Sequence, residues 1–150
     1  MVSNMKLNKF LFYLLSFIWG FPMTIIGCIV GVVLLSLGYK PKKYGYCYYF
    51  EVGENWVGMN LGIIFLTSKS PSEQTMSHEL GHAMQNCMYG VFMPLIIAIP
   101  SVTRYWYREY LIRSGKKAHS ELPDYYSIWF ESQASTLGTE FITWHKNNTK

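Results

Sequence analysis

The sequence predicts an α+β protein in which one N-terminal transmembrane helix precedes a small domain of a short antiparallel sheet and several helices. Two observations support this fold class. Residues 10–39 contain no charged residue, and residues 46–67 are rich in aromatic and β-branched residues before a helix-start pattern. A chain of 150 residues has room for one membrane segment and one compact domain. We therefore divide it into a membrane anchor, residues 1–43, and a domain, residues 44–150.

The uncharged run is longer than the roughly 20 apolar residues that cross a bilayer. It has neither the short apolar core nor the small-residue cleavage site of a signal peptide. A domain this small cannot cover such a segment on every side. Gly20 and Pro22 interrupt the run, so it forms either one kinked span or a shallow hairpin. We favour the single span because neither half of a hairpin would cross alone, and we expect an integral membrane protein with the lipid bilayer as a partner.

Lysines flank this run on both sides. Lys6 and Lys9 precede it, and Lys40, Lys42 and Lys43 follow it. The excess of one lysine after the run favours a cytoplasmic C-terminal domain.

The composition of the whole chain agrees with membrane contact. Only 15% of the residues are charged, against about 25% in soluble domains. The net charge is +4, but the basic residues flank apolar stretches and form no long run, so we expect no nucleic-acid partner. Three widely spaced cysteines make neither a disulfide framework nor a C-x-x-C metal pattern, which favours a reducing compartment.

Two strands are expected after the membrane segment. Tyr46–Val52 is rich in aromatic and β-branched residues, residues 53–55 (Gly-Glu-Asn) mark a turn, and Gly62–Thr67 is again strand-like. This order predicts a β-hairpin, or at least two strands of a small antiparallel sheet.

A helix should follow over residues 71–88. Ser70 is suited to the N-cap, Pro71 to the first helical position, and Glu73 completes a capping box. Gly90 lies just beyond the expected end.

Two more helices are expected in the C-terminal part. Residues 91–102 are apolar but too short to cross a bilayer. Residues 103–115 combine arginines with aromatic residues, which is typical either of a membrane-interface helix or of an ordinary amphipathic helix. A last helix begins near Asp124 and continues towards Gly138 or beyond.

Residues 75–84 read TMSHELGHAM and contain the H-E-x-x-H spacing. His78 and His82 are slightly more than one helical turn apart, so both can bind one tetrahedral zinc ion from the same helix face. Glu79 can reach a zinc-bound water, whose pKa zinc lowers to around 7, and act as its general base. The sequence therefore predicts His78 and His82 as metal ligands and Glu79 as catalytic. The alternative is two ordinary surface histidines on a helix.

Catalytic zinc usually takes three protein ligands and leaves one position open. The downstream candidates are Glu109, His119, Glu121, Asp124, Glu131, Glu140 and His145. Glu131 is preferred because it lies in the middle of an expected aromatic helix, where a carboxylate is costly unless a partner compensates it. We predict it as the third ligand. The alternatives are a surface glutamate at 131, with His119 or His145 as the ligand.

These residues resemble the zincin metallopeptidase signature. The positions inside and beside the H-E-x-x-H motif are uncharged, with Thr75 three residues before the first histidine. The run Glu131–Ser135 is similar to the glutamate-bearing helix of gluzincins, although many gluzincins have an aspartate where this chain has Ser135. Residues 85–88 hold no glycine or histidine at the metzincin offsets, which excludes that class.

The resemblance implies that residues 44–150 form a gluzincin-like zinc-binding domain. It also implies an edge strand that pairs with an extended peptide substrate, for which Gly62–Thr67 and Tyr46–Val52 are candidates. A donor for the oxyanion is expected as well. The candidate donors are Tyr89, Tyr125, Tyr126, Arg104 and Arg108. The phrases RYWYREY and DYYSIWFESQAS are also similar to stretches of small uncharacterised bacterial and phage-encoded membrane proteins.

The leading functional hypothesis is a membrane-anchored zinc peptidase that hydrolyses a peptide bond near the membrane surface. One alternative is a catalytically inactive zinc-binding membrane protein that acts as a structural or partner-binding module. A third possibility is a small membrane effector, such as a phage-encoded factor, with incidental histidines.

Overall fold

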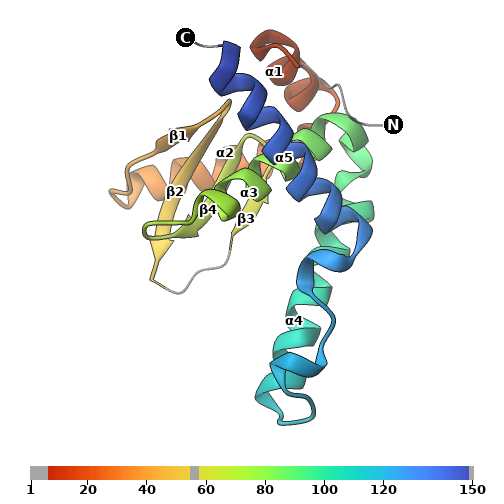
Figure 1. The fold of residues 1–150 in the computed structure, drawn as a ribbon. Helices are drawn as coiled ribbons and strands as arrows, with labels where there is room; N and C mark the ends of the chain where they lie inside the picture. Colours follow the sequence, from red (N-terminus) through yellow and green to blue (C-terminus); the bar gives the residue numbers. More distant parts are fainter. Residues whose placement is uncertain (1–6, 55–57, 149–150) are drawn as a thin grey trace.

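The computed structural model describes residues 7–54 and 58–148; Lys6 and Asn55, which entered the predictions above, lie outside these ranges. Figure 1 shows the ribbon. In chain order the elements are α1 (Lys9–Ile18), α2 (Phe21–Ser36), β1 (Lys42–Tyr44), β2 (Cys47–Gly53), β3 (Met59–Leu61), β4 (Ile64–Ser68), α3 (Glu73–Tyr89), η1 (Gly90–Phe92), η2 (Pro94–Ala98), α4 (Ile99–Arg113), η3 (His119–Glu121), η4 (Tyr125–Ser127) and α5 (Trp129–Asn148). The α+β composition agrees with the prediction. The predicted division at residue 43 falls inside β1 and stays a prediction.

The four strands form one mixed sheet in the order β1-β2-β4-β3. The predicted hairpin between residues 46–52 and 62–67 is wrong, because β2 and β4 pair in parallel. The antiparallel partner of β4 is β3, a short strand that the sequence pattern did not reveal. Leu61 pairs with Ile64 across a tight turn in which Gly62 has a φ of +76°, a conformation that glycine adopts without strain.

Helices cover both faces of this sheet. Figure 1 shows α2 behind the sheet, with α3 and α5 in front of it. The alternation of side chains along the strands explains the arrangement. Phe50 and Leu66 belong to one buried cluster with Met23 of α2, whereas Phe65 belongs to another with Leu80 of α3. The sheet therefore separates two apolar cores.

The helices α3 and α5 cross at unusually close range. A Cβ atom at Gly81 would overlap the carbonyl oxygen of Ala134, and one at Gly138 would overlap the carbonyl oxygen of Ser77. Only glycine at both positions lets the two backbones approach this closely. The crossing brings the first turn of α5 beside the middle of α3.

The predicted N-terminal transmembrane helix is wrong. The apolar run is divided into α1 with 10 residues and α2 with 16, and the two axes differ by 96°. No single helix in the described part of the chain is long and apolar enough to cross a membrane. Two pairs of helices, each bent between its members, are together long and apolar enough to cross a membrane. They are α1 with α2, and Glu73–Phe92 with Pro94–Arg113, which are bent by 116°.

A buried polar network explains why the run breaks near Gly20. Asn86 of α3 donates from Nδ2 to the carbonyl oxygen of Gly20 and to Thr24 Oγ1, both at 3.2 Å. The Thr24 hydroxyl donates in turn to the carbonyl oxygen of Ser16 at 2.8 Å. The bend against α3 gives the buried amide nitrogen of Asn86 its two acceptors, and buried polar groups need hydrogen-bond partners. The partner Asn86 is 66 residues away from Gly20, so the hydropathy of the run contained no sign of it.

The predicted helix at residues 71–88 is confirmed as α3, with a different N-cap. Ser72 replaces Ser70 as the cap, and its Oγ accepts from the backbone nitrogen of Thr75 at 3.1 Å. Gly90 ends the helix as expected, with a φ of +56°. The segment after it is helical as η1, η2 and α4, and α4 ends just before Gly115 as predicted.

Candidate metal centre

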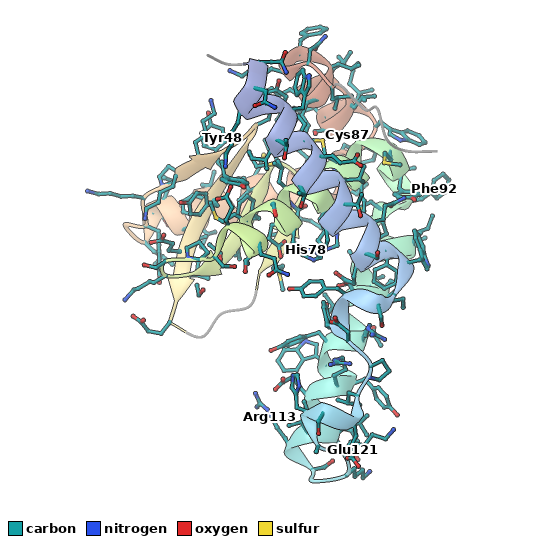
Figure 2. The ribbon with its side chains drawn as sticks, in the orientation of Figure 1. Tyr48, His78, Cys87, Phe92, Arg113 and Glu121 are labelled. Carbon is teal, nitrogen blue, oxygen red and sulfur yellow. The ribbon has the colours of Figure 1, made fainter. Side chains whose placement is uncertain are left out.

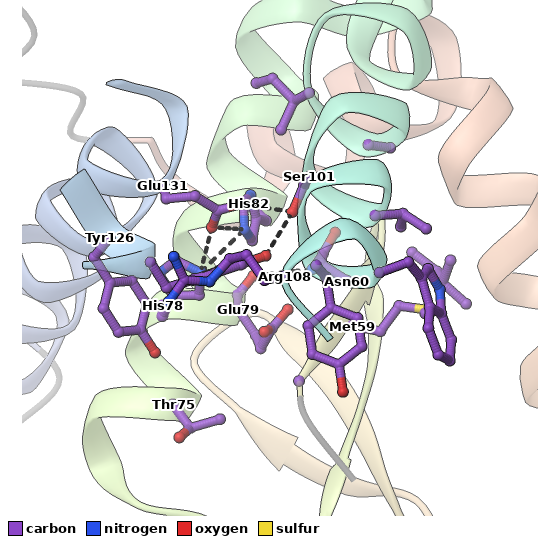
Figure 3. A pocket seen from close by; sticks show the side chains of 18 of the residues that line it. Met59, Asn60, Thr75, His78, Glu79, His82, Ser101, Arg108, Tyr126 and Glu131 are labelled. Carbon is purple, nitrogen blue, oxygen red and sulfur yellow. Dashed lines mark hydrogen bonds and ion pairs between the residues drawn. The ribbon is translucent and has the colours of Figure 1, made fainter. Parts of the chain in front are cut away.

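The metal centre is built on the middle of α3, the most buried helix of the described chain. Every residue from Met76 to Cys87 is buried, because the sheet lies on one side of α3 and α5 on the other. His78 and His82, one turn apart, point towards α5 (Figure 3). Their rings meet edge to face with centroids 4.7 Å apart.

Glu131 of α5 completes the group. Its Oε2 lies 3.0 Å from His78 Nε2 and 3.3 Å from His82 Nε2, and the two imidazole nitrogens are 3.1 Å apart. The predicted position in the middle of a helix is wrong, because Glu131 lies in the first turn of α5. His78, His82 and Glu131 form a buried group that can hold a metal ion. The structure thus brings together the three predicted ligands.

The tautomer of His78 follows from its neighbour Ser135. The Ser135 hydroxyl donates to the carbonyl oxygen of Glu131 at 3.1 Å, so its oxygen is left to accept a hydrogen bond. His78 Nδ1 lies 2.9 Å from this oxygen and therefore carries the proton. The Nε2 atom of His78 then presents a lone pair to Glu131.

Gln85 fixes the tautomer of His82. Its amide nitrogen donates to the carbonyl oxygen of Phe130 at 2.7 Å and to Gln133 Oε1 at 2.9 Å, which fixes the orientation of the amide. Its Oε1 therefore faces His82 Nδ1, 2.8 Å away, and accepts the proton of that nitrogen. The Nε2 atom of His82 also presents a lone pair to the centre.

Two lone pairs and a carboxylate oxygen thus converge on one point. Three such atoms repel one another unless a cation lies between them. Their separations of 3.0–3.3 Å are close to the edge of a tetrahedron, about 3.3 Å, around an ion held at the usual zinc–ligand distances. The donor set and the spacing fit a small divalent cation.

Glu131 is fully buried and is oriented by α4. Ser101 of α4 donates to Glu131 Oε1 at 2.5 Å, and Tyr125 lies 3.1 Å from the Ser101 hydroxyl and donates to it. Burial acts to raise the pKa of Glu131. In the metal-free site, protons that the imidazole Nε2 atoms of His78 and His82 donate to this carboxylate, together with the hydrogen bond from Ser101, outweigh burial and lower the pKa. Glu131 therefore stays ionised.

Glu79 occupies a different environment beside the same centre. Burial raises the pKa of its carboxyl to about 7, and its Oε2 has no hydrogen-bond partner in the described chain. A Cβ atom at Gly58 would overlap Glu79 Oε1, so the glycine leaves room for the carboxylate. Asn60 of β3 donates from Nδ2 to the backbone oxygen of Glu79 at 3.0 Å, which holds α3 against the edge of the sheet.

A cavity of about 590 Å³ opens in front of this group. His78, Glu79, His82 and Glu131 line it, together with Gly58 and β3. Figure 3 shows Met59, Asn60 and Tyr126 around the same space. The edge strand at the site is therefore β3. The expected choices, residues 46–52 and 62–67, are wrong because β2 and β4 are the inner strands of the sheet.

The remaining sequence candidates lie elsewhere or have other roles. Glu109 and His119 line the cavity without joining the ligand group. Glu121 accepts from the backbone nitrogen of Ala118, and Asp124 caps η4. His145 packs against the rings of Tyr46 and Phe141. Figure 2 shows Glu121 beside Arg113 at the C-terminal end of α4, well away from His78.

Among the candidate oxyanion donors, Tyr126 is in ring contact with a ligand. Its ring packs edge-on against His78 with centroids 5.0 Å apart, and it lines the cavity. Arg104 and Arg108 instead donate to carbonyl oxygens of residues 123–125, and Tyr89 donates to Gln133. Tyr125 is engaged by Ser101.

Sequence reasoning missed Gly58, Gln85 and Ser101 at this site. Gln85 lies three residues after His82, and this helical spacing was the signal that could have identified it. Gly58 and Ser101 carry no comparable local signal, because each meets its partner only through the tertiary fold.

The fold and site together define an α+β protein with a buried His-His-Glu group suited to a metal ion and open to a cavity. Comparisons with protein-family models, with curated proteins and with solved structures find no match to this chain.

Proposed function

We propose that this protein is a zinc-dependent peptidase in which His78, His82 and Glu131 hold the metal and Glu79 acts as general base. The observation that carries the proposal is the convergence of two imidazole lone pairs and one carboxylate oxygen within 3.3 Å of one another. Nitrogen and carboxylate donors at tetrahedral spacing favour zinc over the larger calcium ion, which prefers oxygen ligands.

The bound zinc ion would polarise a substrate carbonyl and make a water more acidic. Glu79 would take the proton of the attacking water and deliver it to the leaving amine. Burial raises the pKa of the Glu79 carboxyl in the metal-free site, so its carboxylate is a stronger base than that of an exposed glutamate. Ser135, Gln85 and Ser101 keep the ligands in the orientation that leaves the cavity side open.

The cavity favours an extended peptide as substrate. Its wall includes Met59 and Asn60 of β3, the edge strand of the sheet, whose outer backbone groups have no strand partner in the described chain. An extended peptide can pair with such an edge through backbone hydrogen bonds. Tyr126, at the cavity wall beside His78, is the candidate donor to the developing oxyanion.

The decisive experiment compares the wild type with Glu79→Gln for zinc content and for turnover of a mixed peptide pool. The variant keeps the shape of the side chain but removes its basic carboxylate. We expect one zinc per chain in both proteins and a loss of hydrolysis by at least about 100-fold in the variant. The double variant His78→Ala/His82→Ala is the control and should bind no zinc.

Two results would contradict the proposal. Loss of zinc from Glu79→Gln would make Glu79 a ligand. Stoichiometric zinc without hydrolysis by the wild type would leave the alternative hypothesis, an inactive zinc-binding module.

A further inference from the structure

The outer face of α2 is apolar along its whole length. Figure 1 shows α2 on the face of the sheet opposite α3, and its inner side, with Met23, Gly27 and Gly31, is buried there. The large side chains on the outer side are exposed; they are Phe21, Ile25, Ile26, Ile29, Val32 and Val33. Ile29 and Val32 are 60% and 66% exposed. A continuous apolar surface of this kind marks an interaction site.

The polar side chains of α2 do not interrupt this surface. Thr24 is fully buried and donates to the carbonyl oxygen of Ser16. Ser36, at the end of the helix, donates to the carbonyl oxygen of Val33 at 2.7 Å. The outer face of α2 therefore offers no free side-chain donor to a polar partner.

The sequence segment that contains α2 carries basic residues and no acidic residue. Residues 1–50 contain five lysines and no aspartate or glutamate, whereas residues 51–150 contain eight lysines and arginines against nine acidic residues. Lys40, Lys42 and Lys43 follow the C-terminal end of α2 and are exposed. Of these, Lys42 pairs with Glu51 at 2.8 Å. The exposed lysines Lys40 and Lys43 thus follow the C-terminal end of the apolar face, and Glu51 of β2 pairs with the lysine between them.

We propose that the outer face of α2 docks the protein onto one leaflet of an anionic lipid bilayer. The aliphatic side chains enter the boundary between headgroups and acyl chains, and the lysines contact the headgroup phosphates. A helix of 16 residues is about 24 Å long, shorter than a hydrocarbon core of about 30 Å, and its inner side stays packed on the sheet. The helix therefore lies along the surface.

A second copy of the chain fits this face poorly. Pairing two α2 faces would bring together two segments that carry lysines and no acidic residue, and like charges repel. An anionic bilayer meets both the apolar and the basic part of the surface. The docking is independent of the peptidase proposal, because Ile25, Ile29 and Val32 do not line the cavity.

The test uses the full chain, made by cell-free synthesis with phosphatidylcholine vesicles that contain or lack phosphatidylglycerol. Flotation of the vesicles measures partitioning. We expect the wild type to float with both and more strongly with the anionic vesicles. The triple variant Ile25→Gln/Ile29→Gln/Val32→Gln should lose about 100-fold in partitioning, because three exposed aliphatic side chains no longer enter the bilayer.

The matched control is Leu95→Gln/Ile96→Gln/Ile99→Gln, which removes three exposed aliphatic side chains from η2 and the start of α4. It should float like the wild type. An equal loss in the two triple variants, or a loss confined to the control, would overturn the assignment to α2. Both variants should keep the zinc content of the wild type, which separates this test from that of the metal site.

The lysines are tested in the same assay. Lys40→Gln/Lys43→Gln should reduce the preference for anionic vesicles by about fivefold per lysine. The control Lys116→Gln/Lys117→Gln, just after the C-terminal end of α4, should leave this preference unchanged. If Lys40→Gln/Lys43→Gln kept the full preference for anionic vesicles, the proposed contact between lysines and headgroup phosphates would be contradicted. A wild type that ignores vesicles and elutes as a dimer, which the α2 variant dissociates, would show that a second copy covers the face and would overturn the proposal.

Discussion

Glu79 and Glu131 face the same cavity, but their pKa values are shifted in opposite directions. Burial raises the pKa of Glu79 to about 7. For Glu131 burial acts in the same sense, but in the metal-free site protons on the two imidazole Nε2 atoms and the hydrogen bond from Ser101 outweigh it and lower the pKa. Pairs of carboxyls separated in this way have different roles in many enzymes. Here the ionised Glu131 is suited to a ligand and Glu79 to proton transfer.

The shift at Glu79 predicts a pH-dependent stability in the metal-free protein. The folded pKa of about 7 lies above the ordinary value of 4.5, so the folded state holds the proton more tightly than the unfolded state. The contribution of the protonated Glu79 carboxyl to stability is therefore greatest below pH 4.5 and is lost as pH rises to about 7. Above pH 7, Glu79→Gln should be more stable than the wild type by up to about 3 kcal/mol.

The measurement is chemical denaturation of chelator-treated protein between pH 4 and pH 8. The advantage of Glu79→Gln should shrink towards zero at the acid end, where the wild-type carboxyl is neutral. A difference that stays constant over this range would show that burial of the charge is not its cause.

Substitution of Gly58 should reduce activity while metal binding is retained. A methyl group at this position would overlap Glu79 Oε1 and displace the carboxylate, while His78, His82 and Glu131 lie outside that contact. Gly58→Ala should retain one zinc per chain and lose peptide hydrolysis by at least about tenfold, because a general base must stay within hydrogen-bond reach of its proton. Metal analysis and peptide turnover, measured on one preparation, check this.

Gly53→Ala is the matched control, since a Cβ atom there meets nothing within 4 Å. It should retain both zinc and activity. If Gly58→Ala lost its zinc, the glycine would have a structural role at the ligands instead.

At the scale of the elements, the crossing of α3 and α5 decides whether the ligands meet. His78 and His82 come from one helix and Glu131 from the other, 49 residues beyond His82 in the sequence. Gly81 and Gly138 set the separation of the two helices, because each approaches a backbone carbonyl of the other helix. The metal group depends on this backbone contact as much as on the ligands themselves.

Gly138→Ala should therefore affect stability and metal binding together. The added methyl group overlaps a backbone atom, which cannot rotate away, so the helices must separate. We expect a loss of about 1–3 kcal/mol in the free energy of unfolding, the usual cost of overpacking, and a weaker affinity for zinc. Thermal denaturation and zinc titration measure both, and Gly53→Ala again serves as the unaffected comparison. Unchanged affinity in Gly138→Ala would mean that the crossing tolerates a wider separation than the structure implies.

At the scale of the whole molecule, the metal should stabilise the fold. An ion shared by α3 and α5 binds the folded state and not the unfolded chain, so it contributes about 2.7 kcal/mol at a free concentration of 100 times its Kd. For a chain of this size we expect zinc to raise the Tm by about 5–10 °C. The measurement is thermal denaturation with and without a chelator.

In His78→Ala/His82→Ala the same addition of zinc should leave the Tm unchanged. A rise of equal size in that variant would place the stabilising ion outside the proposed centre.

The local features of the site were predictable from the sequence, and those that depend on distant partners were not. Residues 75–84 identified the helix and both histidines, because helical spacing places them on one face. Hydropathy predicted the wrong geometry for residues 10–39, since it contains no information on Asn86, the distant residue that donates hydrogen bonds to Gly20 and Thr24 at the bend. The strand β3 was missed because three residues are too few to show an alternating pattern.

The sequence by itself determined the chemistry that this protein can offer: two imidazoles and one carboxylate beside them on a single helix, and an apolar, basic N-terminal segment. Helical periodicity and side-chain chemistry are local, so no partner was needed to infer them. Only the tertiary structure decided that Glu131 meets the two histidines, that β3 forms the edge of the sheet at the cavity, and that α1 and α2 bend apart. Each of these depends on contacts between residues far apart in the chain, such as Gly138 with Ser77 and Asn86 with Gly20.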